Sequence, residues 1–173
     1  MFCFCLFGWA VMYIPISYGQ LSGVNTINAS GSNYSGNPGG VSGKNYTSFT
    51  NAVNALKLYG VNSKVTFNVY SGTYLEHINI PTITGTSATN TVTFQSLSLD
   101  STSVVLNYSA SNVDSNFVVY LNGADYFTFR KMTIKATGST YAYAVQLANG
   151  ADHNTFVNNI IQTISGSITT YVA

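Results

Sequence analysis

Charged residues are scarce in this chain. Only 6 % of its 173 residues are charged, and the net charge is +1 at pH 7. A nucleic-acid-binding surface needs clustered Lys and Arg, and an acidic tail needs a run of like charges. The sequence excludes both, so we expect no nucleic-acid partner. Solubility must come from hydroxyl and amide groups, and Ser, Thr and Asn are plentiful throughout.

Cysteine is almost absent. The chain has two, Cys3 and Cys5, and both lie in the apolar segment that opens the sequence. Once that segment is removed, the protein has no disulfide, no thiol nucleophile and no cysteine metal site. The sequence also shows no Ser-His-Asp arrangement, no phosphate-binding glycine loop and no metal-ligand spacing. We therefore expect neither a cofactor nor a metal.

Residues 1–19 are predicted to be a signal peptide. The apolar run ends in Ser17-Tyr18-Gly19, small residues of the kind that precede a signal peptidase site, so cleavage is expected before Gln20. A membrane span is a weaker interpretation, because about 20 apolar residues are needed and Pro15 interrupts the run. No Lys or Arg supplies the usual positive start, so either the amino terminus provides that charge or the true start lies upstream. The expected location is secreted or bacterial cell surface.

What the chain does contain is a repeat. Four segments recur with one offset of 27 residues. The step from the Thr-Phe pair at 93–94 to the next pair at 128–129 is instead 35 residues, which indicates an insertion in the middle repeat. The matches are Asn122-Gly123-Ala124-Asp125 with Asn149-Gly150-Ala151-Asp152, Thr128-Phe129 with Thr155-Phe156, Ile134 with Ile161, and Val65-Thr66-Phe67 with Val92-Thr93-Phe94.

This repeat predicts an all-β parallel solenoid. Units of this length become stable when each stacks on the next and shares a continuous core. Each copy has the alternating polarity of a strand, so Phe67, Phe94, Phe129 and Phe156 are expected to form one internal column. The alternative is a sandwich with chance Thr-Phe pairs, but chance does not explain a whole block repeated in register.

The regions before the repeats differ in character. Residues 20–46 are rich in Gly, Ser and Asn, with room for a short strand at Val24–Ile27. Residues 47–60 show helical spacing of apolar side chains, with Thr47 or Ser48 as N-cap and Gly60 at the end. We expect this helix to cap the first turn of the stack, whose edge would otherwise be exposed. Residues 61–173 would form the stacked turns.

One stretch is specific enough to suggest a family. Val65–Tyr70, a turn at 71–73, and a strand at Tyr74–Pro81 carry the pattern Gly-Thr-Tyr-x-Glu and Ile-x-Ile-Pro after a capping helix. This resembles the opening of right-handed parallel β-helix proteins of the pectin-lyase-like superfamily, which includes pectin methylesterases. The later patterns Asn-Gly-Ala-Asp, Phe-x-x-Met-Thr-Ile and Asn-Thr-Phe-x-Asn-Asn resemble those of large secreted bacterial surface proteins with that fold. The resemblance runs from Thr47 to the end.

The resemblance implies three sheets per turn and outer grooves that bind or cleave polysaccharide. It does not carry over a catalytic set. Residues 144–147, Ala-Val-Gln-Leu, are only faintly similar to the glutamine strand of the esterases, and no Asp follows in the required context. The acidic calcium cluster of pectate lyases and the Asp group of polygalacturonases are likewise missing. The motifs therefore specify a fold rather than an activity.

Asp125 and Asp152 are the weak catalytic candidates. Equivalent positions on neighbouring parallel strands lie about 4.8 Å apart, and glycoside cleavage uses two carboxylates about 5 to 9.5 Å apart. Repulsion could raise the pKa of one of them. The favoured interpretation is structural, because an Asp after Asn-Gly can bond the local backbone of a turn. His153 lies beside Asp152, but its aligned position holds Tyr126, as expected of a variable surface site.

Other polar residues have structural explanations as well. Glu76 and His77 would point to opposite faces of a strand, and His77 would be solvated or partly packed. Arg130, Lys131 and Lys135 could bind an acidic sugar but suit a solvated turn better. Amide ladders could form from Asn154, Asn158 and Asn159. Tyrosine rings could stack on sugars, although no single tyrosine is assigned to a site. The tyrosines considered are Tyr70, Tyr74, Tyr108, Tyr120, Tyr126, Tyr141 and Tyr143.

Two functional hypotheses follow. The first is a noncatalytic extracellular β-helix that serves as scaffold, adhesin or glycan-binding segment, with a polysaccharide or cell-surface glycan as partner. The second is the N-terminal part of a polysaccharide-active lyase, hydrolase or esterase. Ile160–Ala173 is strand-like without a cap, so we expect a fragment of a longer protein. The shortage of acidic and basic residues favours the first hypothesis.

Overall fold

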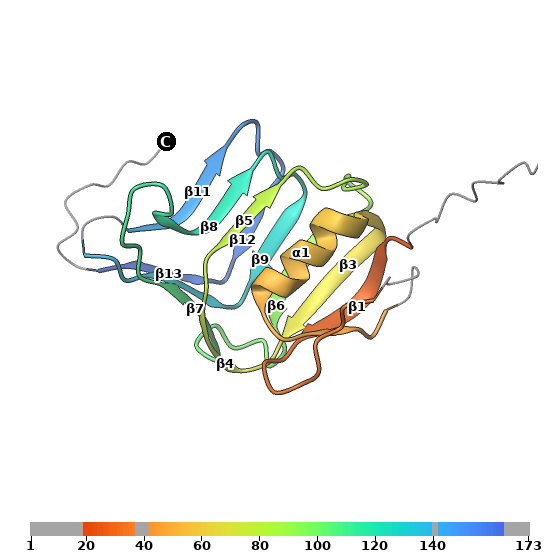
Figure 1. Cartoon of the computed structure of the whole chain (residues 1–173), viewed down its shortest axis with the longest axis horizontal. Coiled ribbons are helices and arrows are strands. Elements are labelled where there is room, and N and C mark those ends of the chain that lie inside the picture. The colour runs from red at the N-terminus through yellow and green to blue at the C-terminus, as the bar shows by residue number, and fades with distance from the viewer. Residues whose placement is uncertain (1–18, 37–41, 140–141, 165–173) are drawn as a thin grey trace, which may run out of the picture.

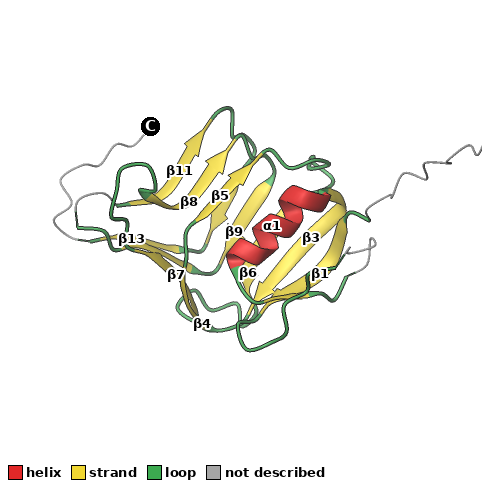
Figure 2. Cartoon of the chain, in the orientation of Figure 1, coloured by secondary structure: helices red, strands yellow, loops and turns green. Residues whose placement is uncertain are grey.

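The structure is a computed structural model, and it describes residues 19–36, 42–139 and 142–164. The predicted signal peptide up to residue 18, both cysteines, Tyr141 and residues 165–173 lie outside this range. The described residues form stacked parallel strands and one short helix, arranged in three sheets (Figures 1 and 2).

The strands occupy three sheets in turn. From β3 onward, consecutive strands belong to the six-stranded, the four-stranded and the three-stranded sheet, and the cycle then starts again. Every strand pair is parallel. The three sheets have the orders β12-β9-β6-β3-β1-β2, β13-β10-β7-β4 and β11-β8-β5. Their strands are β1 (Leu21–Ile27), β2 (Asn45–Tyr46), β3 (Val61–Val69), β4 (Gly72–Leu75), β5 (Ile78–Pro81), β6 (Val92–Ser96), β7 (Val104–Tyr108), β8 (Phe117–Asn122), β9 (Phe127–Arg130), β10 (Thr133–Ala136), β11 (Tyr143–Ala148), β12 (Thr155–Val157) and β13 (Ile160–Thr163).

The predicted phenylalanine column is confirmed. Phe67, Phe94, Phe129 and Phe156 are register partners on β3, β6, β9 and β12. Their ring centroids are separated by 4.9, 5.4 and 5.2 Å in succession, and each pair is stacked. Aromatic pairs of this kind add about 0.5 to 1.5 kcal/mol beyond the burial of their area. The 27-residue offset in the sequence therefore corresponds to vertical contact in the core.

The other two sheets form the remaining walls of the same core. Leu106 of β7 pairs with Ile134 of β10, and both are fully buried. Leu121 of β8 is also fully buried, whereas its register partner Leu147 on the edge strand β11 is 48 % exposed. Ile161, the partner of Ile134 on the edge strand β13, is 50 % exposed. Leu147 and Ile161 are thus half exposed because β11 and β13 have a neighbouring strand on one side only.

The insertion predicted in the middle repeat consists of longer loops. Residues 97–103 connect β6 to β7, whereas residues 70–71 alone connect β3 to β4. The hydroxyls of Ser96, Ser98 and Ser103 hydrogen-bond to one another and hold the base of the longer loop. A second long loop, residues 109–116, precedes β8. The insertion therefore leaves the strand register intact.

The predicted helix is present as α1 (Phe49–Tyr59). Ser48 is the N-cap, and its hydroxyl accepts a hydrogen bond from the Asn51 N–H at 3.0 Å. Gly60, with φ of 65°, ends the helix and donates its N–H to the Leu56 carbonyl. The buried face contains Phe49, Ala52, Val53 and Leu56. α1 lies next to β5, in line with the row formed by β5, β8 and β11 (Figure 2).

The prediction of one continuous strand from Tyr74 to Pro81 is wrong. The structure divides it into β4 and β5, and Glu76 and His77 lie in the connection between two different sheets. The two residues therefore do not alternate across one strand. The reason is that the chain must turn from one wall to the next after only a few residues, which apolar alternation alone does not reveal.

Candidate functional site

The two Asn-Gly-Ala-Asp segments lie directly over one another at the turn before β9 and before β12. The Asn149 side-chain amide donates to the Asn122 side-chain oxygen. The Asp125 carboxylate accepts the backbone N–H of Asp152 at 2.6 Å. The predicted proximity of the two Asp residues is thus present, and the expected local turn bond is replaced by a bond between repeats. Asp125 serves to join one turn to the next.

The residues that follow the two aspartates, Tyr126 and His153, have stacked rings. Tyr126 and His153 both have positive φ, 65° and 57°, and their ring centroids lie 4.8 Å apart with a 19° angle between planes. Left-handed backbone is uncommon outside glycine and is held here by the turn geometry. His153 therefore occupies the position of Tyr126 one repeat later, as the alignment predicts.

Asn154 and Asn159, two of the predicted ladder residues, connect one repeat to the preceding one. The Asn159 side-chain oxygen accepts the N–H of Met132 at 3.1 Å, and its amide donates to the Phe129 carbonyl at 2.8 Å. Asn154 makes the equivalent pair of bonds to the backbone one corner earlier. The partners are backbone groups of the preceding repeat rather than other asparagines, so no ladder of aligned amides is needed.

Glu76 binds the N-terminus of α1. Its two carboxylate oxygens accept the backbone N–H groups of Phe49 and Thr50 at 3.1 and 2.9 Å, and the Thr50 hydroxyl donates at 2.6 Å. The first N–H groups of a helix have no partner within the helix, and a negative charge there is stabilising. The role of Glu76 is to fix the helix on the sheets.

His77 is packed between aromatic rings. Its ring stacks on Tyr108 at 4.2 Å and on Phe117 at 5.1 Å, and its Nδ1 is buried without a hydrogen-bond partner among the described residues. Part of the ring lines a small hollow beside Lys57 and Asn79. Of the two expectations for His77, the partly packed one is confirmed.

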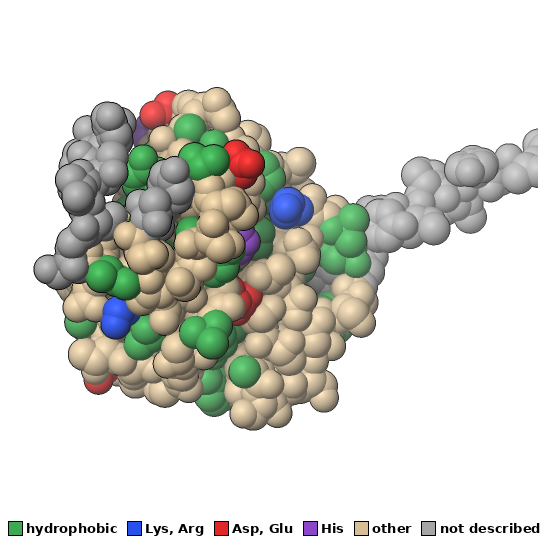
Figure 3. All heavy atoms as spheres, turned by 60° about the vertical axis from the view of Figure 1, so that its left-hand side comes forward, with side chains coloured by type: hydrophobic (Ala, Val, Ile, Leu, Met, Phe, Trp, Pro, Cys, Tyr) green, Lys and Arg blue, Asp and Glu red, His purple; other side chains and the backbone are tan. Residues whose placement is uncertain are grey.

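The basic residues do not gather in one place. Arg130 ends β9, Lys131 has φ of 52° at the corner before β10, and Lys135 lies on β10 itself. Figure 3 shows charged side chains scattered singly over a surface formed mainly by uncharged polar groups. On the face that Figure 3 draws, positive charge is not concentrated in the way that an acidic sugar chain would require.

The tyrosines divide between packing and surface. Tyr74 is buried, and its hydroxyl donates to the carbonyls of Tyr70 and Ile27. Tyr108 stacks on His77 as described above, and Tyr120 packs at a tilt against Phe117. Tyr70 is 41 % exposed. Several of the rings considered for sugar stacking are thus part of the protein's own packing.

The outward face of the six-stranded sheet carries a row of threonines. Thr66, Thr93, Thr128 and Thr155 are register partners on β3, β6, β9 and β12. Their hydroxyls make no hydrogen bond within the described part of the chain. Beside them, the Gln95 amide donates to the Asn68 side-chain oxygen at 2.9 Å. This face is mainly polar, and its charged residues are Lys64, which is exposed on β3, and Arg130, which follows Gln95 in the register.

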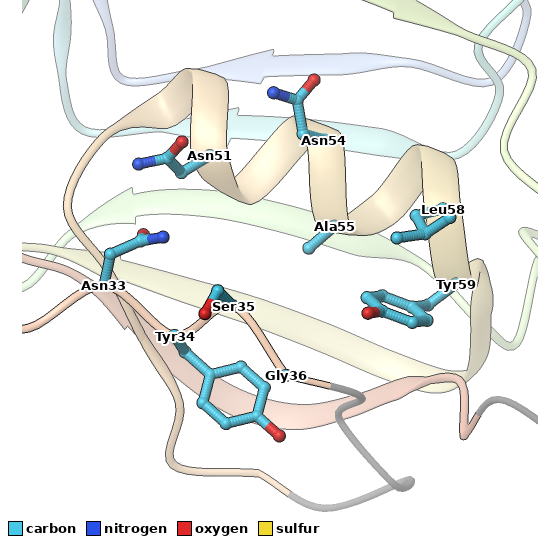
Figure 4. Close-up of a pocket in the computed structure, with 9 residues that line it drawn as sticks. All are labelled: Asn33, Tyr34, Ser35, Gly36, Asn51, Asn54, Ala55, Leu58 and Tyr59. Carbon is cyan, nitrogen blue, oxygen red and sulfur yellow. The ribbon is translucent and has the colours of Figure 1, made fainter.

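A hollow of about 180 Å³ lies between α1 and residues 33–36 (Figure 4). Its helical wall consists of Asn51, Asn54, Ala55, Leu58 and Tyr59. The sequence analysis missed it, although these positions recur at helical spacing and form a second face of α1, away from the buried one. None of the nine residues that line the hollow is charged.

Within the described ranges, no group of three or more His, Cys, Asp or Glu side chains could hold a metal ion. No helix in the same ranges is long and apolar enough to cross a membrane. Comparison of the chain with protein-family models, with curated proteins and with solved structures found no match.

Proposed function

We propose that the chain forms part of a right-handed parallel β-helix of the pectin-lyase-like type, and that it is a noncatalytic extracellular scaffold that binds glycans. The cyclic order of the three parallel sheets supports the β-helix. The right-handed sense is the one expected for parallel strands linked by crossovers. The motifs that resemble large secreted surface proteins support the extracellular location.

The absence of catalysis is supported by the structural hydrogen bonds that the carboxylates accept. Glu76, Asp100 and Asp125 each accept at least one backbone N–H. The Asp100 carboxylate also accepts the Thr102 hydroxyl, and these bonds lower the pKa of Asp100. A general acid for glycoside cleavage needs the opposite shift, a raised pKa. These side chains stabilise turns, corners and the helix start.

Glycan binding is supported by the mainly uncharged outer surface. Hydroxyl and amide groups cover the outward face of the six-stranded sheet, and the stacked rings of Tyr126 and His153 stand at its edge. Sugars offer hydroxyl groups for hydrogen bonds and apolar ring faces for stacking on aromatic side chains. Such a surface suits a neutral glycan better than a charged polymer.

The test combines a glycan array with product analysis. The whole chain is screened for binding, and each bound polysaccharide is then incubated with the protein and examined for new reducing ends, unsaturated sugars or released methanol. The double variant Asp125→Asn with Asp152→Asn is tested in parallel, because Asn keeps an acceptor oxygen for the bond between repeats. We expect binding without products and unchanged binding by the variant. Product formation that the double variant abolishes would instead establish the polysaccharide-active enzyme.

A further inference from the structure

We propose that the hollow between α1 and residues 33–36 is a binding site for one neutral sugar ring. This inference rests on the proposed glycan binding and names a site for it, separate from the outer sheet faces. Drug-sized ligands occupy sites of roughly 300 to 1,000 Å³. A volume of about 180 Å³ suits a smaller ligand, such as a single sugar unit at the end or side of a glycan.

Both walls of the hollow are fixed before any ligand arrives. On one side, the N–H of Tyr34 donates to the Asn45 carbonyl at 2.7 Å, and the Asn45 amide donates to the carbonyls of Asn28 and Ser32. On the other side, Glu76 and Ser48 hold the start of α1. A site on fixed walls loses little entropy when a ligand binds.

Thr47 orients the polar groups at one end of the hollow. The Asn33 side-chain oxygen accepts the Thr47 N–H at 3.1 Å, and the Asn51 amide donates to the Thr47 hydroxyl at 3.0 Å. These bonds leave the amide nitrogen of Asn33 and the side-chain oxygen of Asn51 without protein partners in the described ranges. The Asn54 side chain makes no hydrogen bond there at all. Donors and an acceptor are therefore available for sugar hydroxyls.

The other end of the hollow is apolar. Figure 4 shows Leu58 and the ring of Tyr59 together at the end opposite Asn33 and Asn51. Leu58 is 68 % exposed, so its side chain is accessible at this end of the hollow. A sugar ring has polar edges and apolar faces, so it can meet the amides with its hydroxyls and cover Tyr59 and Leu58 with its face.

The uncharged lining of the hollow also disfavours a charged ligand. A carboxylate or phosphate placed in the hollow would lose hydration and find no cationic side chain among the lining residues, which is costly. The Lys44 ammonium lies outside the lining, 4.5 Å from the centroid of the Tyr34 ring, and already interacts with that ring. The lining residues supply neutral hydrogen bonds only. The ligand class that fits is therefore an uncharged hexose or pentose unit rather than a uronic acid or sugar phosphate.

Side-chain amide signals in NMR spectra test this site directly. Methyl glucoside, methyl galactoside and methyl mannoside are titrated into the whole chain at millimolar concentrations, with glucuronic acid as the charged comparison. We expect at least one methyl glycoside to shift the NH₂ signals of Asn33 and Asn54. Asn54→Ala should weaken that binding about fivefold to tenfold, the effect of one hydrogen bond. Asn79→Ala, which removes an exposed amide on β5, should leave it unchanged.

Two filling variants complete the test. Ser35→Trp and Ala55→Trp place an indole in the hollow from opposite walls, and either should abolish the shifts while the backbone spectrum stays folded. The site is refuted if no methyl glycoside shifts these signals, or if glucuronic acid alone does. If the filled variants still bind the same glycans on the array, glycan binding stands and this site does not. If the wild-type chain binds nothing in either experiment, both proposals fail.

Discussion

The rings of Phe129 and Phe156 lie 5.2 Å apart with only 6° between their planes, although 27 residues separate them in the chain. Their backbones are register partners on β9 and β12. Each phenylalanine of the column therefore packs on the equivalent residue of the neighbouring repeat. Stability in such an arrangement comes from the contacts between neighbouring repeats as much as from each repeat itself.

Truncation of Phe94 should be severely destabilising. Phe94 is fully buried and stacks on Phe67 on one side and on Phe129 on the other. Phe94→Ala leaves a cavity in the middle of the column, and we expect a loss of about 3 to 5 kcal/mol in the free energy of unfolding. Urea unfolding followed by circular dichroism measures it. Phe94→Leu, which fills most of the space, should cost less than half as much, and equal losses would contradict the cavity argument.

The sequence was sufficient to predict the stack because the repeat itself encodes register. The Thr-Phe pairs repeat with two steps of 27 residues and one of 35, and they specify that Phe67, Phe94, Phe129 and Phe156 meet in one column. The break between β4 and β5 was not predictable in this way. It depends on where the chain turns a corner between sheets, and no second copy of that stretch marks the corner.

Replacement of Glu76 tests the anchoring of α1. The Glu76 carboxylate accepts two backbone N–H groups at the helix start. Glu76→Ala removes both acceptors and the charge near the helix N-terminus, and we expect a loss of about 1 to 2 kcal/mol in unfolding free energy. Asp114→Ala is the matched control, since Asp114 is exposed and makes no hydrogen bond within the described residues. If the two variants lose equal stability, the carboxylate does not anchor the helix.

The polar contacts were harder to predict than the core. Glu76 reaches a helix 26 and 27 residues earlier in the chain, and Asn159 bonds to backbone atoms of the preceding repeat. Backbone partners carry no sequence signal, because every residue has an N–H or a carbonyl. Asn159 lies 27 residues after Met132, so comparison of the repeats pairs an asparagine with a methionine and shows no shared side-chain chemistry. The asparagine needs the Met132 N–H, not an asparagine at that position.

Asn159→Ala should open the corner between β9 and β10. The variant leaves the Met132 N–H without its acceptor, and Met132 is fully buried. We expect a loss of about 1 to 3 kcal/mol in stability and faster hydrogen exchange at the Met132 amide, measured by NMR. Asn159→Asp keeps the acceptor and loses only the donor to the Phe129 carbonyl, so Met132 should stay protected. Equal exchange of Met132 in both variants would show that the side-chain oxygen is not its partner.

The buried hydroxyl of Tyr46 should lower the free energy of unfolding at alkaline pH. Its ring packs against Phe67 at 5.6 Å, and its hydroxyl is buried without a hydrogen-bond partner in the described part of the chain. Burial, with smaller effects of Tyr34 and Tyr59, raises the pKa of Tyr46 from 10.0 to about 12. The folded state thus holds this proton more tightly than the unfolded state does. The contribution of this pKa shift to the free energy of unfolding is complete below pH 10 and is lost as the pH rises towards 12.

Tyr46→Phe should therefore have two effects that urea titrations at neutral and alkaline pH can separate. At neutral pH the variant should be more stable by about 1 kcal/mol, because a buried hydroxyl without a partner is removed. Between about pH 10 and 12 it should lose roughly 2 kcal/mol less than the wild-type chain, since a shift of two pKa units is worth about 2.7 kcal/mol in full and most of it is lost over that interval. Tyr70→Phe, at a ring that is 41 % exposed, should reproduce neither effect. A Tyr46→Phe variant with the wild-type alkaline slope would mean that the Tyr46 hydroxyl ionises in the folded protein as readily as in the unfolded chain, which a buried ring packed against Phe67 should prevent.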